Sequence, residues 1–409
     1  MTTTSYRIRR TLIVALALTC ISLEASAGKA GPEFLVNTTT AQSQVLPSVA
    51  GLADGSFVAT WSSWQDGSKM GVYGQRFKAG GRPVKGEFQV NTYTPEYQFD
   101  AAVAMLTGGG FVVVWYSDGQ DGSSLGIYGQ RYRANGSPAG SEFPVNTTTQ
   151  NIQQWPSVAG LADGGFVVTW SSNDGDQYGV YGQRFRPRGQ PRGGEFRVNT
   201  TTVDDQQRPS VAGFADGTFV VVWESQAQDY GGTWGVYGQR FRANGTPLGG
   251  EFRVNNRRKD DQWNPSIAKL ADGGFVVVWE ATGQDGSGQG IFARRYDANK
   301  KPVGNEFQVN TYTQDDQQYP SVAGLANGGF VVTWTSWLQD GSGQGVYGQR
   351  YGADGNPAGA EFPVNTNTVD DQQNSSVTGL TNGNFVVAWE SYAQDGHFWG
   401  VYGQRFRVP

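Results

Sequence analysis

Short apolar runs separated by turn residues recur along this chain with a period of 53–56 residues. Each unit contains four runs of four to seven residues that are rich in β-branched and aromatic side chains, which is typical of strands. A repeat of this length with several strands per unit indicates a propeller or an array. The units are marked by the phenylalanine of a Glu-Phe-x-Val-Asn motif: Phe34, Phe88, Phe143, Phe196, Phe252, Phe307 and Phe362.

The second run of each unit is apolar at nearly every position, as in Phe111-Val-Val-Val-Trp115. A strand that is apolar on both faces must be covered on both faces, and radially stacked blades provide that cover. An Asp-Gly or Asn-Gly pair lies between the first and second runs in six of the seven units, which predicts a tight hairpin with positive φ at both central residues. We therefore expect an all-β fold of four-stranded antiparallel blades.

The phase of the repeats predicts how the ring closes. A lone fourth strand, Glu33–Asn37, precedes the first complete unit, and the sequence stops just after a third strand at 400–406. Pairing of these two segments would complete the last blade and leave no unpaired edge inside the ring. We expect a single seven-bladed propeller over residues 28–409, with repeats that start near 33, 87, 142, 195, 251, 306 and 361.

Residues 1–27 have the features of a secretory signal peptide: three arginines, a short apolar run from Thr11 to Leu23, and Ala25-Ser26-Ala27 before the cleavage point. The mature chain is then secreted, displayed on the cell surface or periplasmic, and has no transmembrane segment. Its 28 basic and 35 acidic residues give a net charge of −7, which disfavours a nucleic-acid partner. Cys20 lies in the signal, so no disulfide is expected.

The predicted topology collects two longer loops per blade on one face, and aromatic side chains gather in these loops. Aromatic rings beside Asp and Gln are typical of carbohydrate-binding surfaces, although the same rings could simply cover one another above the blades. The candidate ligand-binding aromatic residues are Trp64, Trp155, Trp234, Trp263, Trp337, Trp399, Tyr319 and Tyr392.

Polar residues also recur in these loops. A glutamine in every crossing loop either satisfies loop backbone groups or belongs to a ring of polar side chains around one mouth of the channel. Gln206, Gln317 and Gln372 are the candidates for ligand contact. Aspartates from neighbouring loops could supply the oxygen ligands that Ca²⁺ prefers, or could cap turns. No cofactor besides Ca²⁺ is indicated, and its candidate ligands are Asp205, Asp229, Asp261, Asp285, Asp316, Asp340, Asp371 and Asp395.

An arginine ends the third run of every unit, and we expect it to form a cross-strand ion pair with the glutamate of the fourth run, as in Arg76 and Glu87. The sequence offers little for nucleophilic catalysis, because His397 is the only histidine and no Gly-x-Ser-x-Gly elbow accompanies it. A two-carboxylate glycosidase stays open. Against it, the acids repeat from blade to blade, whereas one active site usually breaks the symmetry of its scaffold.

The residues Gly328 to Thr366 combine Gly-Gly-Phe-Val-Val-x-Trp with Gln-Asp-Gly-Ser-Gly-x-Gly-Val-Tyr-Gly-Gln-Arg-Tyr and Glu-Phe-x-Val-Asn-Thr. This run resembles the repeat arrays of large secreted bacterial proteins of the RTX and adhesin type. The resemblance implies a secreted, surface-associated role. The nonapeptide calcium repeats that often accompany such arrays are absent from this chain.

These observations favour a non-enzymatic, lectin-like or adhesin-like protein that binds glycans at several points of its loop face, where multivalency would raise avidity. The partner is then an extracellular glycan or a surface protein. The alternatives are a structural or protein-interaction propeller, and a polysaccharide-degrading enzyme.

Overall fold

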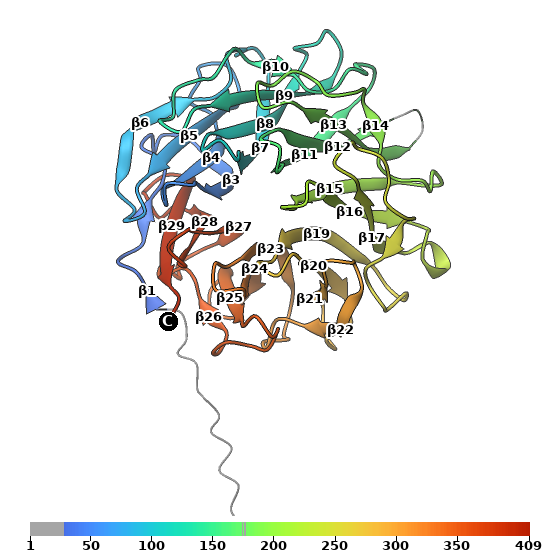
Figure 1. Cartoon of the computed structure of the whole chain (residues 1–409). Coiled ribbons are helices and arrows are strands. Elements are labelled where there is room, and N and C mark those ends of the chain that lie inside the picture. The colour runs from blue at the N-terminus through green and yellow to red at the C-terminus, as the bar shows by residue number, and fades with distance from the viewer. Residues whose placement is uncertain (1–27, 174, 176) are drawn as a thin grey trace, which may run out of the picture.

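The computed structural model describes residues 28–409 apart from 174 and 176, and the predicted signal peptide therefore lies outside the described residues. Seven antiparallel sheets are arranged radially around a central channel, and the innermost strand of each sheet lines it (Figure 1). The prediction of a seven-bladed, all-β propeller is confirmed. No helix in the described part of the chain is long and apolar enough to cross a membrane.

The blades are numbered in chain order, and each is given from its inner to its outer strand. Blade 1 contains β3 (Gln44–Gly51), β4 (Phe57–Ser63), β5 (Gly71–Phe77) and β6 (Pro83–Gln89). Blade 2 contains β7 (Gln98–Met105), β8 (Phe111–Asp118), β9 (Leu125–Tyr132) and β10 (Phe143–Pro144). Blade 3 contains β11 (Gln153–Gly160), β12 (Phe166–Asn173), β13 (Tyr178–Phe185) and β14 (Phe196–Arg197). Blade 4 contains β15 (Gln206–Gly213), β16 (Phe219–Gln226), the 3₁₀ turn η1 (Tyr230–Gly232), β17 (Trp234–Phe241) and β18 (Phe252–Arg253).

Blade 5 contains β19 (Gln262–Lys269), β20 (Phe275–Thr282), β21 (Gln289–Tyr296) and β22 (Pro302–Gln308). Blade 6 contains β23 (Gln317–Gly324), β24 (Phe330–Trp337), β25 (Gln344–Tyr351) and β26 (Phe362–Pro363). Blade 7 contains β27 (Gln372–Gly379), β28 (Phe385–Tyr392) and β29 (Trp399–Arg407), completed by β1 (Gly28–Lys29) and β2 (Phe34–Leu35).

The ring closes through the N-terminal segment, as the repeat phase predicts. Strand β2 pairs with β29 at Tyr402 and Gly403, and β1 pairs with its end at Phe406 and Arg407. Glu33, just before β2, also accepts hydrogen bonds from the backbone and hydroxyl of Thr366 in the neighbouring blade, at 2.8 and 2.7 Å. The closing strand therefore makes both the contacts of an outer strand and the contact between blades.

The second strand of each blade carries the core. It is buried on both faces, and it contains one tryptophan without exposed surface in every blade: Trp61, Trp115, Trp170, Trp223, Trp279, Trp334 and Trp389. Each hydrophobic cluster spans two neighbouring blades, for example Phe57 and Trp61 of blade 1 with Leu380 and Val386 of blade 7. Replacing such a tryptophan with alanine would cost about 3–5 kcal/mol of stability.

Two local predictions are wrong. In the inner hairpin of blade 1 only Gly55, not Asp54, has positive φ, and the Gly55 N–H bonds the Leu52 carbonyl at 3.0 Å. The second wrong prediction concerns the ion pair of Arg76: a terminal guanidinium nitrogen of Arg76 lies 3.6 Å from a carboxylate oxygen of Asp54. Glu87, the predicted partner of Arg76, accepts hydrogen bonds from the backbone and hydroxyl of Thr38, at 2.7 and 2.9 Å. The outer-strand glutamate thus joins neighbouring blades rather than neighbouring strands.

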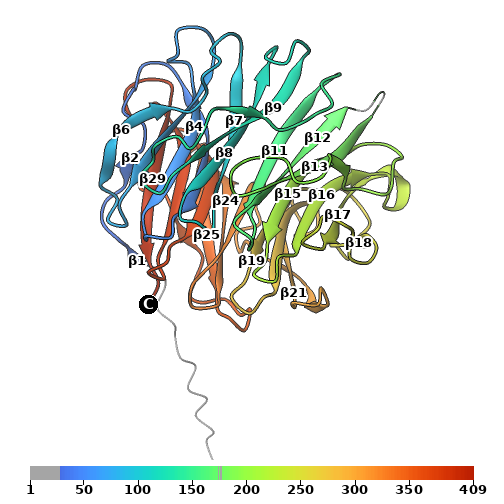
Figure 2. The ribbon, with the colours of Figure 1, turned by 45° about the horizontal axis from the view of Figure 1, so that its top comes forward.

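The strands run between two faces, as Figure 2 shows. We call the face with the inner hairpins, such as 52–56, and the turns between third and fourth strands, such as 78–82, the hairpin face. The loop face carries the connections between second and third strands and between successive blades. The central channel opens on both faces, so it has a loop-face mouth and a hairpin-face mouth.

Candidate functional site

The loop-face mouth is formed by a bulge that recurs in the innermost strand of every blade. Pairing between the first two strands shifts register there, as between Gln154 and Ser157 of blade 3. One residue of each bulge has φ of 48 to 55°, in the left-handed region that non-glycine residues seldom adopt. We call these residues the mouth ring: Leu46, Asp100, Trp155, Arg208, Asn264, Tyr319 and Asn374.

The backbone of the mouth ring is held by the preceding blade. In six of the seven blades the ring residue donates its N–H to the side chain that follows the buried tryptophan of the blade before. The pairs of ring residue and acceptor are Asp100 with Ser62 (3.1 Å), Arg208 with Ser171 (3.0 Å), Asn264 with Glu224 (2.8 Å), Tyr319 with Glu280 (2.5 Å), Asn374 with Thr335 (3.2 Å) and Leu46 with Glu390 (2.5 Å). These bonds offset the cost of the strained conformation, which is of order 1–3 kcal/mol per residue.

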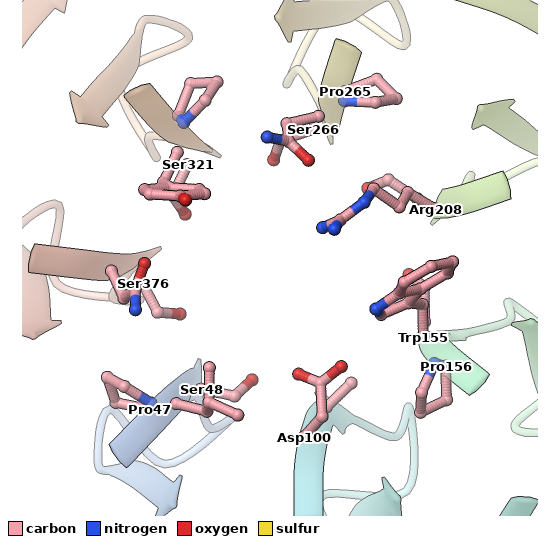
Figure 3. Close-up of a pocket in the computed structure, with 18 of the residues that line it drawn as sticks. Pro47, Ser48, Asp100, Trp155, Pro156, Arg208, Pro265, Ser266, Ser321 and Ser376 are labelled. Carbon is pink, nitrogen blue, oxygen red and sulfur yellow. The ribbon is translucent and has the colours of Figure 1, made fainter. Parts of the chain in front are cut away.

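The mouth ring surrounds a cavity of about 350 Å³. Figure 3 shows the Arg208 and Asp100 side chains directed into this space, with the Trp155 ring between them on the same side. The Arg208 guanidinium lies 4.6 Å from the centre of the Trp155 ring, and its Nε is 3.5 Å from a Glu224 oxygen. A carboxylate, a cation and two aromatic side chains, Trp155 and Tyr319, therefore face one cavity.

Burial changes the acidity of the carboxyl groups at this mouth. Desolvation raises the pKa of Asp100 to about 6, and the positive charge of Arg208 limits the rise. Desolvation also raises the pKa of Glu280 to about 7, and the N–H groups of Tyr319 and Asn264 counteract it. The pKa values of Glu224 and Glu390 are raised by burial as well. Asp100 lines the cavity, whereas the three glutamates are buried next to the mouth ring, to whose backbone N–H groups they bond. Carboxyl groups whose pKa lies near neutrality at such a place are candidates for acid–base chemistry.

The predicted aromatic residues divide between the mouth and the outer loops. Trp155 and Tyr319 belong to the mouth ring, and Trp263 immediately precedes it in blade 5. Trp64 instead packs edge-on against Tyr97, and Tyr392 against Trp399. Trp234 starts β17 and Trp337 ends β24, so both lie beyond the inner strand. The structure thus brings together two of the eight predicted aromatic residues at one cavity.

The predicted glutamines are buried inside their loops. Gln206, Gln317 and Gln372 have no exposed surface. The amide of Gln206 donates to the carbonyl oxygens of Val203 and Asp204 and accepts from Asn199, and the other blades repeat this pattern. The glutamines therefore satisfy loop backbone groups, and they do not form a polar ring around the mouth.

The predicted aspartates bond to loop backbone or to neighbouring side chains. Four of them accept the backbone N–H of the first residue of a third strand: Asp205 from Tyr178, Asp261 from Trp234, Asp316 from Gln289 and Asp371 from Gln344. Asp285, Asp340 and Asp395 accept an N–H two residues on, and Asp229 is buried beside Tyr237 and Asn255. Within the described residues, no three His, Cys, Asp or Glu side chains converge to hold a metal ion. Calcium binding stays a prediction.

Sequence reasoning missed Asp100, Arg208, Asn264, Glu224 and Glu280. Two signals could have found them. The position before the Pro-Ser step differs in nearly every unit, although the residues around it repeat. A glutamate also follows the buried tryptophan in three units, at a strand position that is otherwise enclosed by the core. Burying a carboxyl group is unfavourable unless it is paired or hydrogen-bonded, so a glutamate at such a position indicates either a bonding partner or a role in catalysis.

Comparison with solved structures shows that the fold occurs in other proteins, at low sequence identity. No family model and no curated protein matches the sequence. Among solved structures, a protein of unknown function from Dyadobacter fermentans DSM 18053 is similar, with 11% identity, a TM-score of 0.59, and coverage of 94% of this chain and 99% of that chain. An α-L-arabinofuranosidase from Fusarium graminearum is 13% identical, with a TM-score of 0.55 and coverage of 93% and 98%. An α-L-arabinanase from Penicillium chrysogenum, complexed with arabinobiose, is 14% identical, with a TM-score of 0.52 and coverage of 93% and 98%.

The expectation of a non-enzymatic glycan-binding protein is wrong. It relied on acids that repeat from blade to blade, and those acids belong to the outer loops. At the mouth ring the symmetry is broken, because only blade 2 contributes an aspartate and only blade 4 an arginine. The arabinofuranosidase and arabinanase structures further contradict it, since both are glycoside-cleaving enzymes built on a propeller that aligns over nearly the whole chain.

Proposed function

We propose that this protein is a glycoside hydrolase whose active site is the loop-face mouth. The observation that carries the proposal is the mouth ring itself: one repeated, strained backbone presents Asp100, Arg208, Trp155 and Tyr319 to a single cavity. Strain that the surrounding structure maintains is typical of functional sites. The similarity in fold to an arabinofuranosidase and an arabinanase supports this assignment, and it makes arabinan and arabinose-containing oligosaccharides the first substrates to test.

Glycoside hydrolysis requires one carboxylic acid and one carboxylate on either side of the scissile bond. Asp100 lines the cavity from blade 2, and Glu280 lies in blade 5, where its buried side chain bonds to the mouth-ring residues Tyr319 and Asn264. With a pKa of about 7, Glu280 retains its proton to higher pH than Asp100, whose pKa is about 6. Both hydrogen bonds to Glu280, from Tyr319 and from the Asn264 amide, end on Oε1, and Oε2 would carry the proton. Glu280 is therefore the proposed acid.

Asp100 is the proposed nucleophile or general base. Arg208 lowers its pKa, which keeps the carboxylate ionised at the pH where Glu280 is still protonated. Trp155 and Tyr319 provide aromatic faces for sugar rings, whose apolar side packs well on such surfaces. Glu224 holds the Asn264 backbone and accepts from the Gln207 amide at 3.0 Å, so it is a positioning residue.

The test is hydrolysis of a panel of polysaccharides and aryl glycosides that includes arabinan, with the residue 28–409 chain and the variants Asp100→Asn and Glu280→Gln. We expect each variant to reduce kcat about 10³-fold, in line with the loss of a catalytic carboxyl. Activity should be highest between pH 6 and 7, where Asp100 is ionised and Glu280 is protonated. Turnover that survives both substitutions would refute the proposed site.

A further inference from the structure

The hairpin face carries a series of arginines, each at the end of a third strand and beside the inner hairpin of its own blade. In three blades the hairpin aspartate pairs with this arginine: Arg76 with Asp54 at 3.6 Å, Arg240 with Asp216 at 3.0 Å, and Arg295 with Asp272 at 3.8 Å. Blades 6 and 7 have Asn327 and Asn382 in place of the aspartate, and blade 2 alone has a glycine there. Its hairpin reads Thr107-Gly108-Gly109-Gly110, so Gly108 occupies the position of the aspartate and Arg131 has no carboxylate beside it.

The missing side chain leaves a cleft, which we call the blade-2 cleft. It has a volume of about 260 Å³ and is lined by Arg131 and Arg133, together with Leu106, Gly108 and Pro187. The two terminal nitrogens of Arg131 donate to the carbonyl oxygens of Pro187 and Ala139, at 2.7 and 3.1 Å. Its Nε is buried and has no hydrogen-bond partner among the described residues.

Arg131 is consequently a partly buried cation without a counter-ion. Burial lowers its pKa, and the neighbouring charge of Arg133 lowers it further. In blade 3, by contrast, the carboxylate of Asp163 raises the pKa of Arg184 and partly offsets the lowering that burial causes. Removing a charge from water without pairing it is unfavourable, so a bound anion would stabilise this arrangement.

Exposed cations flank the cleft on both sides. Lys78 and Arg82 lie in the equivalent turn of blade 1, and Arg186 and Arg188 lie in that of blade 3, next to the Pro187 that lines the cleft. None of these four side chains forms an ion pair with a described residue. Asp163, an acid on the same face, pairs with Arg192. Positive charge therefore extends over three consecutive blades of a protein whose overall charge is negative.

We propose that the blade-2 cleft is an oxyanion-binding site that accepts one carboxylate or sulfate group of an acidic polysaccharide. Arg131 and Arg133 contact the group in the cleft, and the flanking cations of blades 1 and 3 contact its neighbours along the polymer. Guanidinium groups suit carboxylate and sulfate groups, because their several N–H donors can bond two oxygens of one anion at once. Large exposed apolar side chains lie elsewhere on the described surface, so the association is electrostatic and weakens with salt. This site is on the opposite face from the proposed active site and does not depend on it.

The experiment measures binding of the residue 28–409 chain to immobilised polygalacturonate, with inorganic sulfate as a competitor. The key variant is Gly108→Asp, which supplies the absent carboxylate. A Cβ at Gly108 would meet no atom within 4 Å, and the resulting Asp-Gly turn already exists in other blades. We expect affinity to fall about tenfold, with the melting temperature unchanged or raised.

The matched control is Asn327→Asp, which places the same added charge in the equivalent hairpin of blade 6. It should change affinity by less than about twofold, because the charge lies away from the cleft. Equal weakening by both variants would show a general charge effect and would overturn the cleft. Absence of binding to the polymer would reject the polysaccharide, and polymer binding that sulfate does not weaken would reject an oxyanion site. Equally tight binding of duplex DNA would reject the chemical class of the ligand.

Discussion

The two mouths of the channel are built from the same seven inner strands, yet they differ in almost every other respect. At the hairpin-face mouth, around a cavity of about 340 Å³, one position is nearly constant: Ala50, Ala104, Ala159, Ala212, Ala268, Ala323 and Thr378. The next position is glycine in five blades, with Met105 and Lys269 in the other two. At the loop-face mouth the equivalent residues are six different amino acids in a left-handed conformation. Residue identity thus repeats more closely at the hairpin-face mouth, and it varies on a constant backbone at the mouth where we propose the active site.

The largest expected effect comes from exchanging the cation at each mouth for alanine. Arg208→Ala should reduce kcat/KM by about 10²–10³-fold, because Asp100 loses the charge that keeps it ionised. The acid side of the pH–rate profile should also move to higher pH. Lys269→Ala, at the hairpin-face mouth, should leave both quantities unchanged. Steady-state kinetics across pH would check this, and an unmoved profile in Arg208→Ala would contradict the role of the guanidinium.

The second effect concerns stability and pH. The pKa of Glu280 rises from 4.5 to about 7 on folding, so the folded protein binds more protons than the unfolded chain between these values. Stability should therefore fall as pH rises from 4.5 to 7, by on the order of 3 kcal/mol from this group. Glu280→Gln should flatten this dependence. Urea denaturation at several pH values measures it, and identical slopes in the two proteins would place the titration elsewhere.

The third effect tests the backbone at each mouth with a β-branched side chain. Asn374→Val places valine at a φ of 53°, which should cost about 2 kcal/mol. Ala104→Thr, at the hairpin-face mouth, copies the residue that blade 7 already has at Thr378 and should change stability by less than about 0.5 kcal/mol. Chemical denaturation of both variants would decide, and similar costs would mean that the left-handed ring is not specially constrained.

The smallest effect separates the two groups of aromatic residues. Trp155→Ala should raise KM about tenfold, because a sugar loses one aromatic face at the mouth. Trp337→Ala, in the outer loops and 38% exposed, should change KM by less than about twofold. Kinetics with a soluble oligosaccharide make the comparison. An equal rise in KM for both variants would extend the substrate site over the loop face.

The repeat period, the doubly apolar second strand and the unpaired ends were enough to predict the blades and their closure. The left-handed backbone of the mouth ring could not be predicted in this way, for a physical reason. Leu46, Trp155, Arg208, Asn264 and Tyr319 each precede a proline, and such residues normally adopt extended conformations. For Leu46, Arg208, Asn264 and Tyr319 a hydrogen bond to the neighbouring blade overrides that local preference. The side chains that meet at the cavity come from separate blades, and only the closed ring brings them together.

The closing strand β2 also determines the order in which the molecule can assemble. In blade 1 the Asn91 side chain accepts the N–H of Val72, only 19 residues away, whereas the same bond in blade 7 joins Asn37 to Val401 across 364 residues. For a flexible chain this difference in loop length adds roughly 2–3 kcal/mol of closure entropy. Blade 7 should consequently be the last to fold and the first to open. Because the mouth ring needs every blade, the proposed activity would appear only at that final step. Its loss on heating would then report the separation of β2 from β29 in blade 7.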